Sequence, residues 1–260
     1  MSLRELVASE GLPDACQALE EILNIPPSGV DVLKDEPRTL IWRSRLPSGA
    51  WAIVKTYRRR SLYDFTRESM TRFRAQREFE SLAFLSKNNV PSVRPICWGY
   101  GRHPESGRFE SVATFQELNV IGLKDHLRSG RAGDRWIEPA ARLVRQGHDI
   151  GFYHGALAPR NILVRPAGWD DPACMFIDTP RSIVFPRPIT GTRMAEHDLM
   201  VLLGEVCGVV GETPLPRFLA TYGMPESDIP RLVDRIKCYR PNRNTRNRAR
   251  AEFLIRRFLS

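Results

Sequence analysis

The sequence lacks any apolar run long enough to cross a bilayer. The longest, Leu199–Val210, is interrupted by Glu205 and falls well short of the roughly 20 residues that a membrane-spanning helix needs. The opening residues MSLRELVASEGL contain no apolar stretch of the signal-peptide type. Because 42% of the 260 residues are hydrophobic, a packed core is expected. We therefore expect a cytoplasmic protein that is either soluble or attached to a membrane only at its surface, with a buried helix at Leu199–Val210.

Cysteine pairs with the spacing of zinc or redox sites are also missing. No two of the five cysteines form a C-x-x-C pair, and their number is odd. The cysteines are Cys16, Cys97, Cys174, Cys207 and Cys238. Scattered cysteines of this kind are typical of reduced thiols in a cytosolic protein.

Acidic residues are outnumbered, since 39 Lys and Arg face 30 Asp and Glu and leave a net charge of +9. Such a balance favours anionic partners. The C-terminal segment 231–260 combines ten basic residues with apolar residues such as Phe253 and Leu259. This pattern suits an anionic inner-membrane surface or a phosphorylated glycolipid, but it is also that of a solvated face on a terminal helix. A basic nucleic-acid-binding module is a further alternative, although no RNP, KH or zinc-finger signature supports specific binding.

The order of the expected elements indicates an α+β fold. One or two short helices are expected in residues 1–30, and two β-rich runs, Thr39–Leu46 and Ala50–Tyr57, flank a Pro-Ser-Gly turn. A long helix follows over about 66–86, and strand-like runs come at Val93–Gly99 and Ser111–Glu117. Beyond residue 119 the pattern is mainly helical. It predicts short and longer helices at Gly122–Leu127 and Pro139–Gly151, a strand at Met175–Ile177 and the Leu199–Val210 helix.

This order is that of a two-lobed protein-kinase-like fold. We expect residues 1–118 to form an N-terminal extension and a strand-rich lobe with one long helix. Residues 119–260 are expected to form a helical lobe that ends in the basic C-terminal segment.

The segment YHGALAPRNIL, residues 153–163, is similar to the catalytic loop of protein kinases. In that signature His-Arg-Asp-Leu is followed by an Asn; the Asp accepts the proton of the attacking hydroxyl and the Asn holds Mg²⁺. His154, Leu157 and Asn161 fill the matching positions, whereas Ala156 stands where the catalytic Asp is expected. The spacing therefore indicates a phosphotransferase loop without its general base.

Candidate nucleotide ligands lie in the first half of the chain. Lys55 ends the apolar run Ala52–Val54, as in the V-A-I-K strand whose Lys reaches the α- and β-phosphates of ATP. Glu78 borders the apolar face of the long predicted helix and could pair with Lys55, and Glu80 competes for that role. Glu117, at the end of a strand-like run, is assigned to the same cofactor site.

Asn161 and Asp178 are the candidate metal ligands. Asp178 follows a short apolar run and stands 17 residues after Asn161, an interval that separates the two metal ligands of kinases. Hard oxygen ligands of this kind suit Mg²⁺ bound together with phosphates. A capping Asp and a turn Asn are the structural alternative.

Two further departures from the kinase pattern accompany Ala156. The expected phosphate-covering segment, Val32–Pro37, contains no glycine, so its backbone cannot approach phosphates in the usual way. The Phe and Gly that follow the metal-binding Asp are replaced by Thr179 and Pro180.

The chain resembles the lipopolysaccharide kinase family, the kinases of Kdo and core heptose in Gram-negative bacteria. The resemblance runs from about residue 38 to residue 204 and includes Arg38–Leu40, Ile177–Arg181 and an Arg193…Asp198-Leu199 element. Members share the protein-kinase fold and typically lack the Gly-rich loop. The resemblance implies ATP and Mg²⁺ as cofactors and an inner-core sugar of lipopolysaccharide, or a lipid-A-linked glycolipid, as partner. With Ala156 in the base position, it implies impaired or unconventional catalysis, or a catalytically inactive pseudokinase acting as a scaffold.

Overall fold

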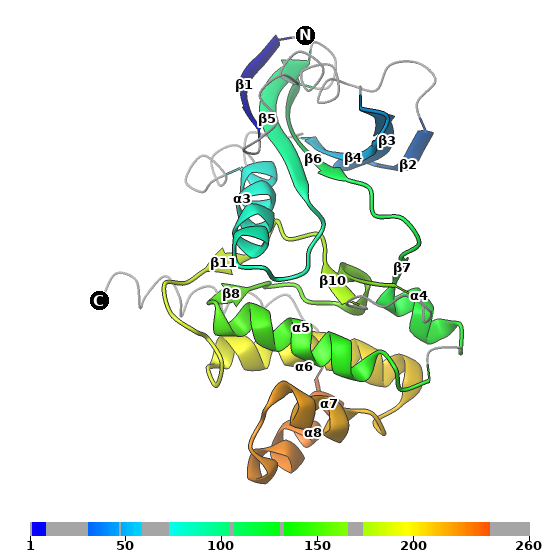
Figure 1. Cartoon of the computed structure of the whole chain (residues 1–260), viewed down its shortest axis with the longest axis vertical. Helices are drawn as coiled ribbons and strands as arrows, with labels where there is room; N and C mark the ends of the chain where they lie inside the picture. Colours follow the sequence, from blue (N-terminus) through cyan, green and yellow to red (C-terminus); the bar gives the residue numbers. More distant parts are fainter. Residues whose placement is uncertain are drawn as a thin grey trace. The chain divides into compact units, whose positions relative to one another are not determined.

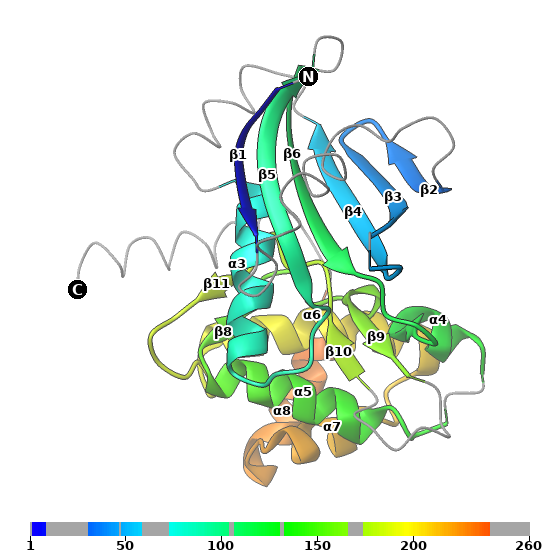
Figure 2. The same ribbon diagram turned by 45° about the horizontal axis from the view of Figure 1, so that its top comes forward.

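The computed structural model describes residues 2–8, 31–46, 48–58, 73–103, 107–130, 133–165 and 174–239. The chain divides into two compact units. The first comprises residues 1–87, 92–118 and 178–181, and the second comprises residues 88–91, 119–177 and 182–260. Figures 1 and 2 show the described elements of each unit.

The first unit is built on a six-stranded sheet with the order β1-β5-β6-β4-β3-β2, whose neighbouring strands are all antiparallel. Its elements are β1 (Ser2–Ala8), β2 (Asp31–Glu36), β3 (Thr39–Arg45), β4 (Trp51–Arg58), α3 (Arg74–Lys87), β5 (Pro95–His103) and β6 (Gly107–Phe115). Helix α3 packs on this sheet against β4, β5 and β6 (Figure 2). The sheet and its single described helix thus place β4 and α3 side by side.

The predicted hairpin of the first unit is confirmed. Strands β3 and β4 pair antiparallel, with Ile41 opposite Lys55 and Leu46 closing the turn through a hydrogen bond to Ala50. The inward-facing side chains of the two strands, Leu40, Trp42, Ala52 and Val54, are buried together. This alternation of buried and outward-facing residues is what the β-rich runs predicted.

Two predictions for the first unit are wrong. Residues Ser2–Ala8 form strand β1, not a helix, because pairing with β5 overrides the helix-favouring Leu, Arg and Glu of this segment. The segment Val32–Pro37 is not a loop, since Asp31–Glu36 is strand β2 and only Pro37 and Arg38 form the turn to β3. The remaining part of the predicted N-terminal helical region, residues 9–30, and residues 66–72 of the predicted long helix lie outside the described residues.

The second unit is mainly helical. Its principal helices are α4 (Leu123–Arg128), α5 (Ile137–Asp149), α6 (Arg193–Val210), α7 (Leu215–Tyr222) and α8 (Ile229–Lys237). Its short elements are β7 (Ile121–Gly122), β8 (Phe152–Tyr153), η2 (Pro159–Asn161), β9 (Ile162–Val164), β10 (Cys174–Phe176), β11 (Ile183–Val184) and η3 (Glu226–Asp228). Strands β10, β9 and β7 form one small sheet, and β11 and β8 form another. In the sequence, the segment 154–161 lies between β8 and β9 and carries most of the predicted catalytic loop.

Helix α6 begins six residues before the predicted start at Leu199. Thr192 caps it, because its hydroxyl oxygen accepts the amide hydrogen of Ala195. Asp198 therefore lies inside helix α6, whereas the predicted helix began one residue after it. Asp198 is one of the buried residues of α6 and is fully buried.

Gly151 joins α5 to β8 at a position that only glycine fits. Its φ is +84°, and a Cβ there would lie 2.4 Å from the carbonyl oxygen of Phe185 and 2.7 Å from that of Arg187. Phe185 in turn donates its amide hydrogen to the Gly151 carbonyl. This close backbone approach fixes the start of the segment that leads to His154.

Candidate active site

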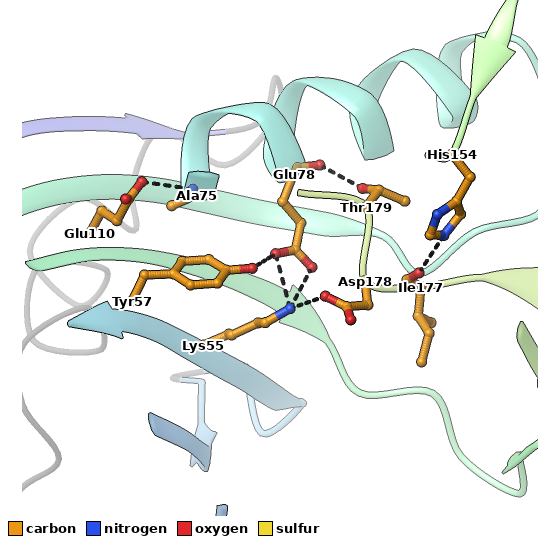
Figure 3. Close-up of polar contacts among 9 residues, drawn as sticks. All are labelled: Lys55, Tyr57, Ala75, Glu78, Glu110, His154, Ile177, Asp178 and Thr179. Carbon is orange, nitrogen blue, oxygen red and sulfur yellow. Dashed lines mark hydrogen bonds and ion pairs between the residues drawn. The ribbon is translucent and has the colours of Figure 1, made fainter. Parts of the chain in front are cut away.

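Lys55 stands at the centre of a buried charge cluster in the first unit. Its ammonium nitrogen lies 3.4 Å from Oε2 and 3.5 Å from Oε1 of Glu78, and it also contacts Oδ1 of Asp178 (Figure 3). Of the two glutamates left open by the helical pattern, Glu78 is the one that contacts Lys55. Glu80 accepts instead a hydrogen bond of 2.9 Å from Gln76 on the same helix.

Two carboxylates, those of Glu78 and Asp178, contact the one ammonium group of Lys55. Burial lowers the pKa of Lys55, but attraction to Glu78 and Asp178 outweighs it and holds the pKa above its ordinary value of 10.5. Burial also raises the pKa of Glu78 above 4.5; Lys55 opposes this shift, and the nearby Asp178 adds to it. Only 6% of the Glu78 side chain is exposed, against 42% for Asp178. Of the two carboxylates, that of Asp178 is therefore the more accessible to solvent.

Tyr57 is a second residue of β4 that holds the Glu78 carboxylate. Its hydroxyl donates a hydrogen bond of 2.6 Å to Oε2 of Glu78, and burial raises the pKa of Tyr57 well above 10.0, so that it stays protonated. Sequence reasoning missed this residue. The available signal was the strand period of two, which puts residues 55 and 57 on the same face of β4.

Asp178 adopts an unusual backbone conformation, with a φ of +55° in the left-handed region. Asp is among the few residues other than glycine that adopt this conformation regularly. The next residue, Thr179, is fully buried, and its hydroxyl donates to the backbone carbonyl of Glu78 at 3.4 Å. Thr179 therefore ties the Asp178 segment to α3 at a position where protein kinases carry a Phe.

In the second unit, Asp198 of α6 anchors the predicted catalytic loop. Its two carboxylate oxygens accept the backbone amide hydrogens of His154 (2.8 Å) and Gly155 (3.0 Å), and Nε2 of His148 lies 3.6 Å from Oδ2. The ring of His154 lies 3.2 Å, through Nε2, from the carbonyl oxygen of Ile177. Since a carbonyl can only accept, Nε2 carries the hydrogen. The sequence had marked Asp198 only as part of a family-like element, without a role.

Asn161 ends the loop and is almost completely buried. Its side-chain nitrogen donates a hydrogen bond of 2.8 Å to the carbonyl of Ala156, and its backbone carbonyl accepts the amide hydrogen of Ile177. Because the amide nitrogen is engaged, Oδ1 is the atom available to act as a metal ligand. Ala156 offers its carbonyl to this contact and to Ala158, and its methyl side chain cannot accept a proton.

The remaining predicted site residue, Glu117, lies just beyond the end of β6 and is partly buried. Its assignment to the cofactor site stays a prediction. No group of three or more His, Cys, Asp or Glu side chains that could hold a metal occurs among the described residues.

Three basic residues of the C-terminal segment belong to α8, and each lies near an acidic side chain. Arg235 lies 2.6 Å from Glu196, Arg231 lies 3.9 Å from Asp228, and Lys237 contacts Glu212. The other residues of the predicted membrane-binding segment, 240–260, lie outside the described residues. None of the helices that the structure describes has the length and apolar character needed to span a membrane.

Replacing Asp198 with Asn is expected to destabilise the protein by about 2–4 kcal/mol, because the amide group has one acceptor oxygen where two backbone N–H groups need one each. Urea unfolding followed by circular dichroism measures the change. Asp149→Asn is the matched control, since this nearby carboxylate is exposed and accepts from Arg145 and Thr190. Equal, small effects of the two substitutions would contradict the anchoring role.

A family model and a solved structure both match this chain. The family model described as lipopolysaccharide kinase (Kdo/WaaP) matches residues 31–234. A solved structure described as WaaP in complex with acyl carrier protein matches with a TM-score of 0.64 and 16% sequence identity, over 90% of this chain and 99% of that one. A comparison with curated sequences found no significant match. The structural likeness confirms the α+β, protein-kinase-like fold, and the family match covers most of the chain. The chain therefore belongs to the lipopolysaccharide kinase (Kdo/WaaP) family.

Proposed function

We propose that this member of the family binds Mg-ATP and phosphorylates an inner-core sugar of lipopolysaccharide slowly, because its catalytic loop has no general base. Family membership itself implies ATP-dependent phosphotransfer in lipopolysaccharide biosynthesis. The observation that carries the finer proposal is the contact of Lys55 with both Glu78 and Asp178. These residues are distant in sequence and are the cation, orienting carboxylate and metal ligand that phosphoryl transfer requires.

The charge balance of the cluster supports a bound cation. Two carboxylates contact one ammonium group, and the negative charge of Asp178 adds to the rise in the pKa of Glu78 that burial causes. A divalent cation at Asp178 would offset it. In the proposal Asp178 and Oδ1 of Asn161 supply oxygen ligands to Mg²⁺, which when bound would neutralise phosphate charge.

In the proposal, some residues of the chain bind the nucleotide and others position the catalytic loop. Lys55, oriented by Glu78, holds the phosphates, and we keep Glu117 as a further residue of the cofactor site. His154 holds the backbone of Ile177, the residue before Asp178, and Asp198 holds the loop on which His154 and Asn161 lie. Positioning and electrostatics of this kind provide most of the catalysis in phosphoryl transfer.

The alternative is a pseudokinase that binds nucleotide or glycolipid without turnover. The observation that favours it is Ala156, which leaves the attacking hydroxyl without a carboxylate to accept its proton. A general base typically contributes about 10²–10⁴-fold to the rate. Both functions share the nucleotide site, so binding is tested first and turnover separately. Attachment to the inner-membrane surface through residues 231–260 is part of the proposal in either case.

The binding test is a thermal shift with ATP, with and without Mg²⁺. Nucleotide at about 100 times its dissociation constant should stabilise the wild type by about 2.7 kcal/mol. Asp178→Asn should lose the Mg²⁺-dependent part, since Asn tolerates the left-handed backbone while removing the charge. Glu205→Gln, which alters a carboxylate paired with Lys124 and Arg160, is the control. No shift of the wild type at millimolar Mg-ATP would refute the proposed nucleotide site.

A further inference from the structure

Helix α3 begins at Arg74, directly after Phe73, a residue whose side chain has no oxygen to accept a hydrogen bond from the first turn. The carbonyl of Phe73 accepts its first intrahelical hydrogen bond, from Arg77, and the first turn contains no acidic residue. The first amide groups of a helix have no acceptors within the helix and carry a partial positive charge. Something outside α3 must therefore satisfy them.

Glu110 of the neighbouring strand β6 supplies the missing acceptor. Its Oε2 accepts the amide hydrogen of Ala75 at 2.9 Å, and the residue is only 1% exposed (Figure 3). A buried carboxylate at this position also offsets the partial charge of the helix end, which makes the contact stronger than a neutral hydrogen bond. One side chain of β6 therefore holds the first turn of α3.

Glu78 follows Ala75 by three residues, so the anchored turn carries it on the same helix face. Two more contacts hold it there: the Tyr57 hydroxyl on its carboxylate at 2.6 Å and the Thr179 hydroxyl on its backbone carbonyl at 3.4 Å. The Tyr57 ring packs in the buried cluster that includes Ala75 and Phe79. Strands β4 and β6 and the segment after Asp178 thus each hold the same short stretch of α3.

We infer that Tyr57 and Glu110 are positioning residues that hold α3 with Glu78 against Lys55. In protein kinases the Lys–Glu pair must be in place for activity, and the position of this helix is a point of control. Here buried contacts from β4, from β6 and from the segment after Asp178 hold the helix that carries Glu78. Only the effect on nucleotide rests on the proposed function; the effect on α3 does not.

The expected effect of a loosened α3 on nucleotide binding follows from the fraction of molecules in which the site is assembled. Nucleotide affinity falls in proportion to the fraction of molecules in which the site is assembled. A hydrogen bond to a charged group is strong enough that its loss changes a local equilibrium roughly 10- to 100-fold. Loosening α3 should therefore weaken nucleotide binding only by the factor by which it lowers the closed fraction, whereas hydrogen exchange follows the opening of the helix itself.

Hydrogen exchange of the ligand-free protein tests the helix directly. In Tyr57→Phe and Glu110→Ala, the amides of residues 77–82 should exchange roughly 10- to 100-fold faster than in the wild type, while those of β3 should be unchanged. Glu110→Gln, which keeps an acceptor oxygen, should restore part of the protection. Tyr100→Phe is the matched control, because Tyr100 stacks on Phe73 in the same region at 4.7 Å and its hydroxyl is not part of the Glu78 contact.

Unchanged exchange of residues 77–82 in Tyr57→Phe would overturn the inference, as would equal acceleration in Tyr100→Phe. A global loss of protection, β3 included, would also count against it, because Tyr57 would then be a general stability residue. Titration with Mg-ATP separates the two proposals. Faster exchange in Tyr57→Phe together with no Mg-ATP binding by the wild type would leave the positioning role standing and refute the nucleotide site.

Discussion

Lys55→Met should reduce the free energy of unfolding by about 3 kcal/mol at neutral pH, because it leaves the carboxylate of Glu78 buried without its cation. The loss should depend on pH. Without Lys55 the pKa of Glu78 in the folded protein rises further, whereas in the unfolded chain it returns to about 4.5. Between these values the folded state binds a proton that the unfolded state does not, so the stability of the variant is greatest below 4.5 and falls as pH rises.

Urea unfolding at several pH values between 4 and 8 measures this dependence. The double variant Lys55→Met/Glu78→Gln should recover most of the stability, since no buried charge is left unpaired. It should not recover Mg-ATP binding, because the cation that faces the phosphates is still absent. A double variant as unstable as Lys55→Met would show that the ion pair is not the source of the loss.

Ala156→Asp should accelerate phosphate transfer by about 10²–10⁴-fold if this chain is a kinase that lacks only its base. The loop backbone at residue 156 is already held by hydrogen bonds from Asn161 and Ala158, and the side chain is only partly buried, so the carboxylate fits without rebuilding the loop. Single-turnover transfer from labelled ATP to inner-core lipopolysaccharide measures the rate. Ala156→Asn is the matched control, equal in size and without a proton acceptor of comparable basicity.

The outcomes of that experiment separate the two proposed functions. Slow transfer by the wild type and fast transfer by Ala156→Asp, with Ala156→Asn unchanged, would support an impaired kinase. No transfer by any of the three, despite Mg-ATP binding, would support the pseudokinase. A wild type already as fast as Ala156→Asp would contradict the importance given to position 156.

The elements that the sequence predicted well are those whose signal is local. The β3–β4 hairpin has alternating apolar residues on both sides of a Pro-Ser-Gly turn, and the structure has the same pairing. The catalytic-loop segment was recognisable because its His and Asn keep a fixed spacing. Lys55 and Glu78 were predicted as a pair from a strand-end lysine and an apolar helix face, and the two side chains are in contact.

The sequence could not reveal contacts that depend on distant elements. Glu110 is an ordinary strand residue until α3 is placed beside β6, and its partner is 35 residues away. Asp198 lies 44 residues from the loop that it anchors. Strand β1 was mistaken for a helix because its residues favour helix and only pairing with β5 makes it a strand. Such assignments need tertiary structure.

Strand β1 has a further consequence for any attempt to isolate the catalytic part of this protein. The family match begins at residue 31, whereas β1 covers Ser2–Ala8 and occupies the outer edge of β5. A fragment cut at the limits of the family match would leave the backbone groups along that edge of β5 without partners. An open edge of this kind is a template for strand pairing with another molecule, so the boundary that sequence similarity suggests would favour aggregation.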